Sequence, residues 1–259
     1  MTIQPPTNTW VTFLKPQPMA RLRLFCLPYA GGGASIFRGW QDVLPASIEI
    51  CPIQLPGREN RYREPRFTQL APLVDALGMA IRPYLTKPFA FFGHSLGGIM
   101  GYELTRYLRH QHGPLPVRLM VSAHRAPQIA YRMPVAHDLP DAELMRELRR
   151  LNGMPDEVLD NANLMEILLP LLRADFAVAE TYRYTPEPPL ACPISAFGGL
   201  QDEGVSAADM EAWQQQTTGN FRLHMLPGDH FSVFKERDPL IAAIGRDLQD
   251  SIDRVWKAP

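Results

Sequence analysis

Phe89-Ala90-Phe91-Phe92-Gly93-His94-Ser95-Leu96-Gly97-Gly98 is an apolar run, then a serine between glycines, then the start of a helical pattern. The sequence predicts a strand over Pro88–Phe92 and a helix over Ser95–Gln111, joined by a very short turn. A turn of this kind exposes its serine above the carboxyl edge of a sheet. The flanking glycines relieve crowding around a strained residue. We therefore expect Ser95 to be a nucleophile.

A serine hydroxyl is a weak nucleophile and needs a base, and the oxyanion that it creates needs hydrogen-bond donors. The backbone N–H of Leu96 lies in the first turn of the expected helix, where amides have no partner within the helix. The loop Pro28–Gly33 follows the expected strand Arg21–Leu27, and we expect the Ala30 N–H to be the second donor. The alternative for this loop is a plain flexible turn. Dinucleotide binding is disfavoured because the loop lacks the GxGxxG pattern with a later acidic residue.

The other two catalytic groups are expected after later strands. Asp202 follows the strand predicted over Cys192–Phe197, and His230 follows the strand predicted over Phe221–Leu226. The chain order nucleophile, acid, histidine is that of the α/β-hydrolase fold. We expect His230 to act as the base and Asp202 to hold its imidazole in the tautomer that accepts the proton of Ser95.

Other residues could take these roles. Glu203 and Asp229 are nearby acids, but Glu203 lies one residue further from its strand and Asp229 adjoins His230 along the chain. His94 adjoins the serine and is expected to point away from it across the turn. The remaining histidines lack a matching loop: His110, His112, His124, His137 and His224.

Short apolar runs alternate with amphipathic stretches after residue 20, which predicts βαβ units and an α/β fold. We expect a mostly parallel, twisted sheet with helices on both faces. The other strands are predicted over Ile48–Ile53 and Val117–Ser122, and the other helices over Thr68–Leu85, Ala207–Gln216 and Pro239–Val255.

The chain is expected to contain one domain, over residues 21–259, after a Pro-rich extended arm at 1–20. The alternation stops at about 128–186, which we interpret as a helical lid insertion. It could instead simply pack on the sheet. In its last helix Glu166, Arg173 and Glu180 are spaced seven residues apart among apolar residues. So narrow a polar stripe predicts a largely buried helix.

Composition excludes several classes of function. Lys and Arg number 26 against 27 Asp and Glu, a net charge of −1, which provides no general attraction to nucleic acid or an anionic membrane. The start lacks a signal-peptide pattern and no apolar run is long enough to cross a bilayer, so we expect a cytoplasmic protein. The three cysteines lack metal-ligand spacing and lie in strand-like segments, which favours buried core positions over a reactive thiol.

Together these motifs resemble the free-standing type II thioesterases that serve nonribosomal peptide and polyketide synthases. The likeness spans nearly the whole chain. It rests on Leu27–Gly32, Leu55–Glu59, Gly93–Gly98, Ser122–Pro127 and Gly228–Phe231. Members of the family often carry two aromatic residues after the histidine, where this chain has Phe231-Ser232.

The resemblance implies hydrolysis of acyl or aminoacyl thioesters on the phosphopantetheine arm of an acyl- or peptidyl-carrier protein, which clears aberrant groups from synthase modules. It implies neither a cofactor nor a metal, and we expect a monomer. A general acyl-CoA or carboxyl-ester hydrolase and a catalytically dead binding protein of the same fold remain alternatives. Arg58, in the Leu55–Glu59 turn, is expected to anchor the loop through an ion pair and not to act in catalysis.

Overall fold

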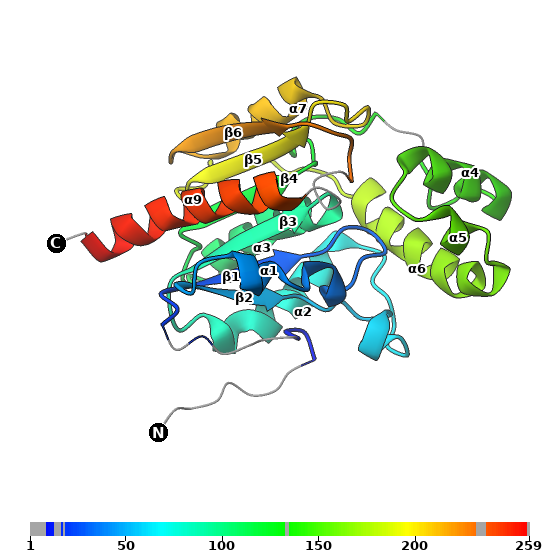
Figure 1. Cartoon of the computed structure of the whole chain (residues 1–259). Coiled ribbons are helices and arrows are strands. Elements are labelled where there is room, and N and C mark those ends of the chain that lie inside the picture. The colour runs from blue at the N-terminus through cyan, green and yellow to red at the C-terminus, as the bar shows by residue number, and fades with distance from the viewer. Residues whose placement is uncertain (1–8, 13–16, 18, 133–134, 232–236, 258–259) are drawn as a thin grey trace.

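The computed structural model of the protein describes residues 9–12, 17, 19–132, 135–231 and 237–257. Its centre is a parallel sheet with strand order β2-β1-β3-β4-β5-β6 (Figure 1). The predicted strands are confirmed to within two residues at their ends, and so is the α/β class. The strands are β1 (Leu22–Leu27), β2 (Ile48–Pro52), β3 (Phe89–His94), β4 (Arg118–Ser122), β5 (Ile194–Gly199) and β6 (Phe221–Leu226).

Both faces of the sheet are buried. Successive side chains of a strand point to opposite faces, so a strand between two helical layers is apolar at most of its positions. In β1, Phe25 and Leu27 join one hydrophobic cluster, whereas Leu24 and Cys26 join the other. This explains why the strands read as continuous apolar runs.

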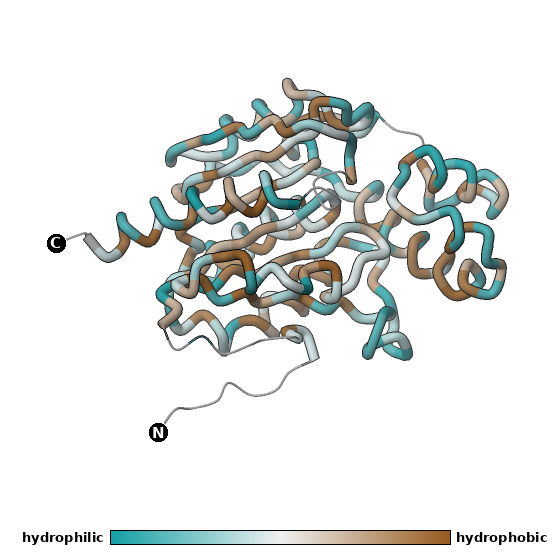
Figure 2. The backbone as a smooth tube through the Cα atoms, in the orientation of Figure 1, coloured by the Kyte–Doolittle hydropathy of each residue, from teal (hydrophilic) through white to brown (hydrophobic). Residues whose placement is uncertain are grey.

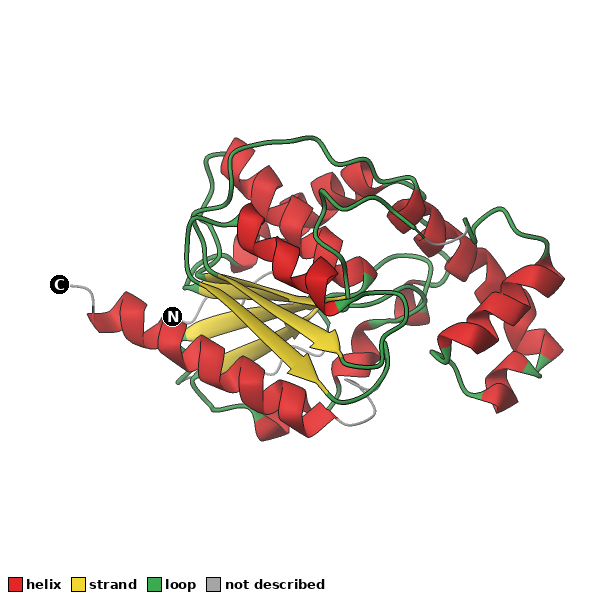
Figure 3. Cartoon of the chain, turned by 90° about the horizontal axis from the view of Figure 1, so that it is seen from above, coloured by secondary structure: helices red, strands yellow, loops and turns green. Residues whose placement is uncertain are grey.

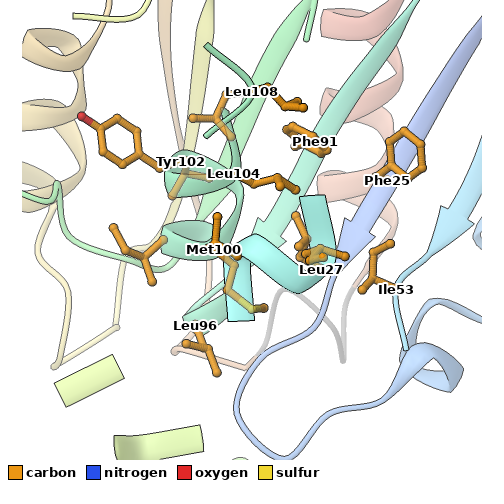
Figure 4. Packing of buried hydrophobic residues seen from close by; sticks show 14 of the residues in the cluster. Phe25, Leu27, Ile53, Phe91, Leu96, Met100, Tyr102, Leu104 and Leu108 are labelled. Carbon is orange, nitrogen blue, oxygen red and sulfur yellow. The ribbon is translucent and has the colours of Figure 1, made fainter. Parts of the chain in front are cut away.

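Helices cover the two faces (Figure 3). The helices α2 (Leu70–Ile81), α3 (Leu96–His110) and α7 (Ala207–Glu211) contribute to one cluster, and α1 (Trp40–Val43) and α9 (Arg237–Lys257) to the other. Figure 4 shows Leu96, Met100 and Leu104 of α3 near Leu27 of β1 and Phe91 of β3. The packing fixes α3, and therefore the turn that precedes it, against the centre of the sheet.

The three cysteines are core residues, as the sequence predicts. Cys26, Cys51 and Cys192 are free and buried. Burial raises the pKa of each thiol, that of Cys192 to about 12, so all three stay protonated at neutral pH.

Three helices occupy the chain between β4 and β5: α4 (Asp141–Leu151), α5 (Asp156–Leu159) and α6 (Ala162–Glu180). They stand beside the sheet (Figure 1), with α4 largely hydrophilic and α6 rich in hydrophobic residues (Figure 2). Their own small cluster includes Leu144, Leu148, Leu159, Met165 and Leu172. The segment therefore has a core distinct from the two that flank the sheet.

The expectation that the last of these helices is largely buried is wrong for its first half. Leu164 and Ile167 are 41% and 64% exposed, because this half packs only on α4 and α5. The second half reaches the main core through Val178. Glu180, expected on the polar stripe, is buried and accepts hydrogen bonds from the backbone N–H groups of Ala136 and His137.

The described part of the first twenty residues touches the domain. Val11 forms an antiparallel bridge with Ile53 and is buried. The ring of Trp10 lies 6.4 Å from that of Phe67, and the Arg61 guanidinium lies 4.3 Å from the Trp10 ring. Among the described residues, no helix is both long enough and apolar enough to cross a membrane.

A buried carboxylate ties α9 to the sheet and leads to a stability prediction. Asp247 accepts hydrogen bonds from Ser195 Oγ at 2.6 Å and from His224 Nε2 at 2.9 Å, and it pairs with Arg222. These partners hold the pKa of Asp247 well below its ordinary value, although burial alone would raise it. We expect Asp247→Asn to lose about 3 kcal/mol of unfolding free energy at pH 7, because the change removes the charge of a buried carboxylate that accepts hydrogen bonds from three side chains.

The pH dependence follows from the lowered pKa. A carboxylate that is more acidic when folded stabilises the protein above its unfolded pKa, here 3.8, and the stabilisation disappears as the pH falls below that value. Urea unfolding should therefore give a smaller difference between Asp247→Asn and wild type at about pH 3, below the unfolded pKa, than at pH 7. Asp250, an exposed partner of the same arginine, provides the control, since Asp250→Asn should change stability by less than about 1 kcal/mol. An equal loss at both pH values would contradict the role of the Asp247 charge.

Candidate active site

Ser95 occupies a strained turn between β3 and α3. Its φ and ψ are 53° and −118°, and a positive φ is unusual for any residue with a Cβ. The turn also needs its two glycines. A Cβ on Gly93 would lie 1.9 Å from the Gly97 carbonyl oxygen, and a Cβ on Gly97 would lie 2.2 Å from that of Leu27. The close approach of these backbones holds the serine at the carboxyl end of the sheet.

The first amides of α3 lie beside this serine. Ser95 is the N-cap of α3, and its own N–H donates to the Ser122 carbonyl at 2.7 Å. The Leu96 N–H follows directly, and within the described residues it has no protein acceptor. The positive end of the helix also faces the serine. Leu96 thus offers one donor for an oxyanion.

The loop after β1 runs next to the same turn, since β1 pairs with β3. It forms a turn in which the Gly32 N–H donates to the Tyr29 carbonyl at 2.9 Å. The Gly31 N–H is already used, because it donates to Asp175 Oδ2 at 2.7 Å. The Ala30 N–H has no protein acceptor in the described part of the chain. This arrangement favours Ala30 over Gly31 as the second oxyanion donor.

The structure brings Asp202 and His230 together across the ends of β5 and β6. His230 Nδ1 lies 2.7 Å from Asp202 Oδ2, and the carboxylate side chain is 2% exposed. A carboxylate can only accept a hydrogen bond, so Nδ1 carries the proton and Nε2 is left as the basic nitrogen. The other oxygen, Asp202 Oδ1, accepts from the N–H groups of Gly204 and Val205 at 2.9 and 3.1 Å. The orienting acid is thus fixed on both sides.

The competing acids have other positions. Asp229 accepts hydrogen bonds from the Phe231 N–H at 2.9 Å and from Asn152 Nδ2 at 3.1 Å, so its carboxylate helps to hold the loop that carries His230. Glu203 lines the cavity described below but is exposed. The carboxylate that lies within hydrogen-bond distance of His230 Nδ1 is that of Asp202. The geometry therefore favours Asp202.

Two further histidines surround His230. The ring of His94 lies 5.3 Å from that of His230, so it packs against the proposed base. The sequence predicts only that His94 points away from the serine and does not predict this contact. His94 Nδ1 lies 2.9 Å from Ser122 Oγ. Burial lowers the pKa of His94 well below its ordinary value and that of His124 to about 3. Both rings are neutral at pH 7 and add no positive charge that would oppose protonation of His230.

Aromatic packing holds the histidine loop, a feature that the sequence analysis missed. The Phe231 ring contacts those of Tyr29 and His94, with centroids 5.1 and 5.9 Å apart. On its far side lies the loop after α4, where a Cβ on Gly153 would lie 2.5 Å from the Phe231 ring. The available signal was that Tyr29, His94 and Phe231 lie within the conspicuous motifs, but the sequence does not show that their rings meet.

All the predicted site residues line one cavity of about 670 Å³: Ala30, Ser95, Leu96, Asp202 and His230. Its roof comes from the segment between β4 and β5, through Leu148 of α4, Met154 of the loop after α4, and Leu168, Leu172 and Phe176 of α6. A volume of this size suits a small ligand or an acyl chain. No group of three His, Cys, Asp or Glu side chains within the described ranges is placed to hold a metal ion. The cavity presents a serine, a paired histidine and two free backbone donors, which are the groups that acyl transfer requires.

Arg58 anchors its loop, as the sequence predicts. Its guanidinium binds both oxygens of Asp175 of α6, at 2.7 and 2.8 Å, and both side chains are buried. Sequence reasoning did not find Asp175. The available signal was an acidic residue inside an apolar helix, which needs a buried cation as its partner.

The chain is similar to known proteins over most of its length. A family model described as the thioesterase domain matches residues 22–248. Gramicidin S biosynthesis protein GrsT of Aneurinibacillus migulanus is 45% identical over 249 residues, which cover 96% of this chain and 97% of that protein. The solved structure of RedJ, a thioesterase from the prodiginine biosynthetic pathway of Streptomyces coelicolor, has a TM-score of 0.85 and 40% identity and covers 89% of this chain and 92% of RedJ.

One relative carries a different name. Linear gramicidin dehydrogenase LgrE of Brevibacillus parabrevis is 45% identical over 245 residues, 93% of each protein. In this chain the loop after β1 lacks the GxGxxG dinucleotide pattern, and the serine turn occupies the centre of the sheet instead. The chain therefore belongs to the thioesterase domain family, has an α/β-hydrolase fold, and is a thioester hydrolase.

Proposed function

We propose that Ser95, His230 and Asp202 form the catalytic triad of this hydrolase and that Ala30 and Leu96 form its oxyanion hole. His230 Nε2 removes the hydroxyl proton as Ser95 Oγ attacks the thioester carbonyl carbon. The carbonyl oxygen becomes an oxyanion, which accepts hydrogen bonds from the two backbone N–H groups. The C–S bond then breaks, and His230 gives its proton to the departing sulfur.

The second half of the cycle releases the acid. Water enters next to the acyl-serine, His230 takes one of its protons, and the hydroxide oxygen adds to the ester carbonyl. The new tetrahedral intermediate uses the same two donors. Its collapse breaks the bond to Ser95 Oγ, which recovers the proton from His230, and the carboxylic acid leaves. Asp202 stabilises the imidazolium in both halves through its contact with Nδ1.

The proposed substrate is an acyl or aminoacyl thioester on the phosphopantetheine arm of an acyl- or peptidyl-carrier protein. The enzyme would act as a type II thioesterase, as a cytoplasmic monomer that meets its carrier transiently and removes aberrant groups from synthase modules. The names of GrsT and RedJ, which refer to gramicidin S and prodiginine biosynthesis, support this assignment. We further propose that residues 21–259 form one domain, in which about 128–186 serve as the lid.

The observation that carries the proposal is the Asp202–His230 pair, placed with Ser95 on one cavity. The roof of this cavity is apolar at Leu168, Leu172 and Phe176, which occupy one face of α6 at four-residue spacing. Such a face suits the hydrocarbon part of an acyl group, while the polar end holds the reacting carbonyl.

The test compares one acyl group on three leaving groups: a phosphopantetheinyl carrier protein, coenzyme A and nitrophenol. We expect kcat/KM to be at least about tenfold higher for the carrier-bound thioester than for the matched acyl-CoA, because only the carrier adds contacts outside the cavity. The matched acyl-pantetheine, without the carrier, separates recognition of the arm from recognition of the protein.

The alternatives predict other outcomes. Equal kcat/KM on carrier and coenzyme A would contradict the carrier assignment and favour a general acyl-CoA or ester hydrolase. A dead binding protein would not react with a fluorophosphonate probe, whereas an activated serine is labelled and loses the label in Ser95→Ala.

A further inference from the structure

The carboxylate of Asp175, in the second half of α6, joins the roof of the cavity to the loop that carries Ala30. One of its oxygens accepts a hydrogen bond from the Gly31 N–H at 2.7 Å. The same carboxylate takes both arms of the Arg58 guanidinium, and its side chain is only 4% exposed. Arg58 also donates to the Gly32 carbonyl at 3.0 Å. Two peptide groups of one short loop are therefore tied to the same buried ion pair.

The conformation of this loop decides where the Ala30 N–H points. The hydrogen bond from Gly32 to Tyr29 and the φ of +80° at Gly31 are the features of a type II turn. In such a turn the second and third residues are joined by the central peptide, and a displacement of that peptide also moves the Cα of the second residue and the N–H attached to it. Here that peptide joins Ala30 to Gly31, and its N–H is the one that Asp175 binds.

Stability alone does not account for a charge pair at this place. Replacing a buried ion pair by apolar side chains is often neutral or favourable for folding. A carboxylate has a directional role that an apolar side chain lacks, because it fixes the direction of the N–H that donates to it. The pair lies between the helix that roofs the cavity and the loop beside the serine, where direction matters for catalysis.

We propose that Asp175 is a positioning residue, which holds the turn Tyr29–Gly32 so that the Ala30 N–H faces the oxyanion formed at Ser95. The inference rests on the proposed function of Ser95 and Ala30. Asp175 does not touch the substrate; it acts through the Gly31 peptide, and Arg58 keeps its charge in place.

The packing of α6 couples the contact between Asp175 and the turn Tyr29–Gly32 to the cavity. Leu172 lines the cavity and also abuts the loop, since a Cβ on Gly31 would lie 2.7 Å from its Cδ2. Phe176 lies one turn after Leu172 and also lines the cavity, and it directly follows Asp175 in the sequence of α6. The face of α6 that would touch an acyl chain and the residue that holds the oxyanion loop thus belong to one rigid helix. An acyl group that displaces α6 would also displace the oxyanion donor.

The experiment measures Asp175→Ala and Asp175→Asn as full-length proteins, with active serines counted by the end point of fluorophosphonate labelling. We expect kcat per labelled serine to fall by about 10- to 100-fold in Asp175→Ala, somewhat less than for complete loss of an oxyanion donor. KM should stay within about twofold, because the defect concerns the tetrahedral state. An alkylboronic acid, which forms a tetrahedral adduct with the serine, should lose affinity by a factor similar to the loss in kcat.

Asp175→Asn keeps the size of the side chain and one acceptor oxygen for Gly31, so it should retain more kcat than Asp175→Ala. It also provides the test if the alanine variant does not fold. Asp247→Asn is the matched control: it removes another buried aspartate paired with an arginine, away from the cavity, and should keep the wild-type kcat per labelled serine.

Wild-type kcat and boronate affinity per labelled serine in both Asp175 variants would overturn the inference, and so would a loss of kcat with unchanged boronate affinity. Failure of the proposed function has a different signature. In that case Ser95→Ala would keep its activity and its fluorophosphonate label, whatever Asp175 does.

Discussion

Ser95→Ala and His230→Ala should each reduce kcat for thioester hydrolysis by on the order of 10⁴-fold or more. Without the hydroxyl no acyl-serine can form, and without the imidazole the hydroxyl keeps its proton. The double variant should be less than about tenfold slower than either single one, because the two groups act as one unit and the second loss removes nothing further. Steady-state rates on one acyl thioester, expressed per mole of folded protein, measure all three variants.

Controls separate this effect from general damage. His110 is largely exposed and pairs with Glu187 on the surface, so His110→Ala should keep the wild-type rate. The Ser95→Ala protein should keep its unfolding transition, since the change removes one hydroxyl and keeps the Cβ at a position whose φ is already positive. Losses in the single variants that multiply in the double variant would contradict the assignment of Ser95 and His230 as partners.

The sheet could be predicted from sequence because its strands are buried on both faces. A strand such as Phe89–His94 therefore begins with a continuous apolar run, Phe89–Phe92, and the glycines that follow mark its end. The order of nucleophile, acid and histidine then placed Ser95, Asp202 and His230 at the same edge of a parallel sheet. The sequence could not give the distance between Asp202 and His230, which comes from the structure.

The helices between β4 and β5 could be predicted as helices but not as a packing arrangement. Periodicity shows which residues share a face, but it does not show what that face meets. The first half of α6 extends beyond the sheet, so Leu164 and Ile167 stay exposed although their pattern is that of a core helix. Glu180 shows the reverse: its pattern predicts an exposed position, but it is buried, because a loop 44 residues earlier brings backbone donors to its carboxylate.

Long-range partners of buried charges were the hardest feature to predict. Asp175 and Arg58 are 117 residues apart, and nothing in the local pattern of either one identifies the other. The contact between His94 and His230 depends in the same way on the ends of β3 and β6. Both cases concern residues beside the proposed triad, so local motifs predict which groups react but not the contacts that orient them.

The choice of acid has the second-largest expected effect and can be tested by matched amide substitutions. Asp202→Asn should keep the fold and lower kcat by on the order of 10⁴-fold, because an amide can present its N–H₂ to His230 Nδ1 and so select the tautomer whose Nε2 carries a proton. Asp202 is also held by two backbone amides, so its amide nitrogen cannot easily turn to face them.

Glu203→Gln is the matched control, since it makes the same chemical change one residue later on an exposed side chain in the same loop. It should lower kcat by less than about threefold, because the Glu203 side chain is exposed and Asp202 is the acid that pairs with His230 Nδ1. Asp229→Asn offers a second comparison. It would disturb the hydrogen bonds that Asp229 accepts from the Phe231 N–H and from Asn152 Nδ2, but it would leave the contact between Asp202 and His230 intact. If Glu203→Gln or Asp229→Asn produced the large loss and Asp202→Asn the small one, the acid would have to be reassigned, whereas Ser95 and His230 would keep their roles.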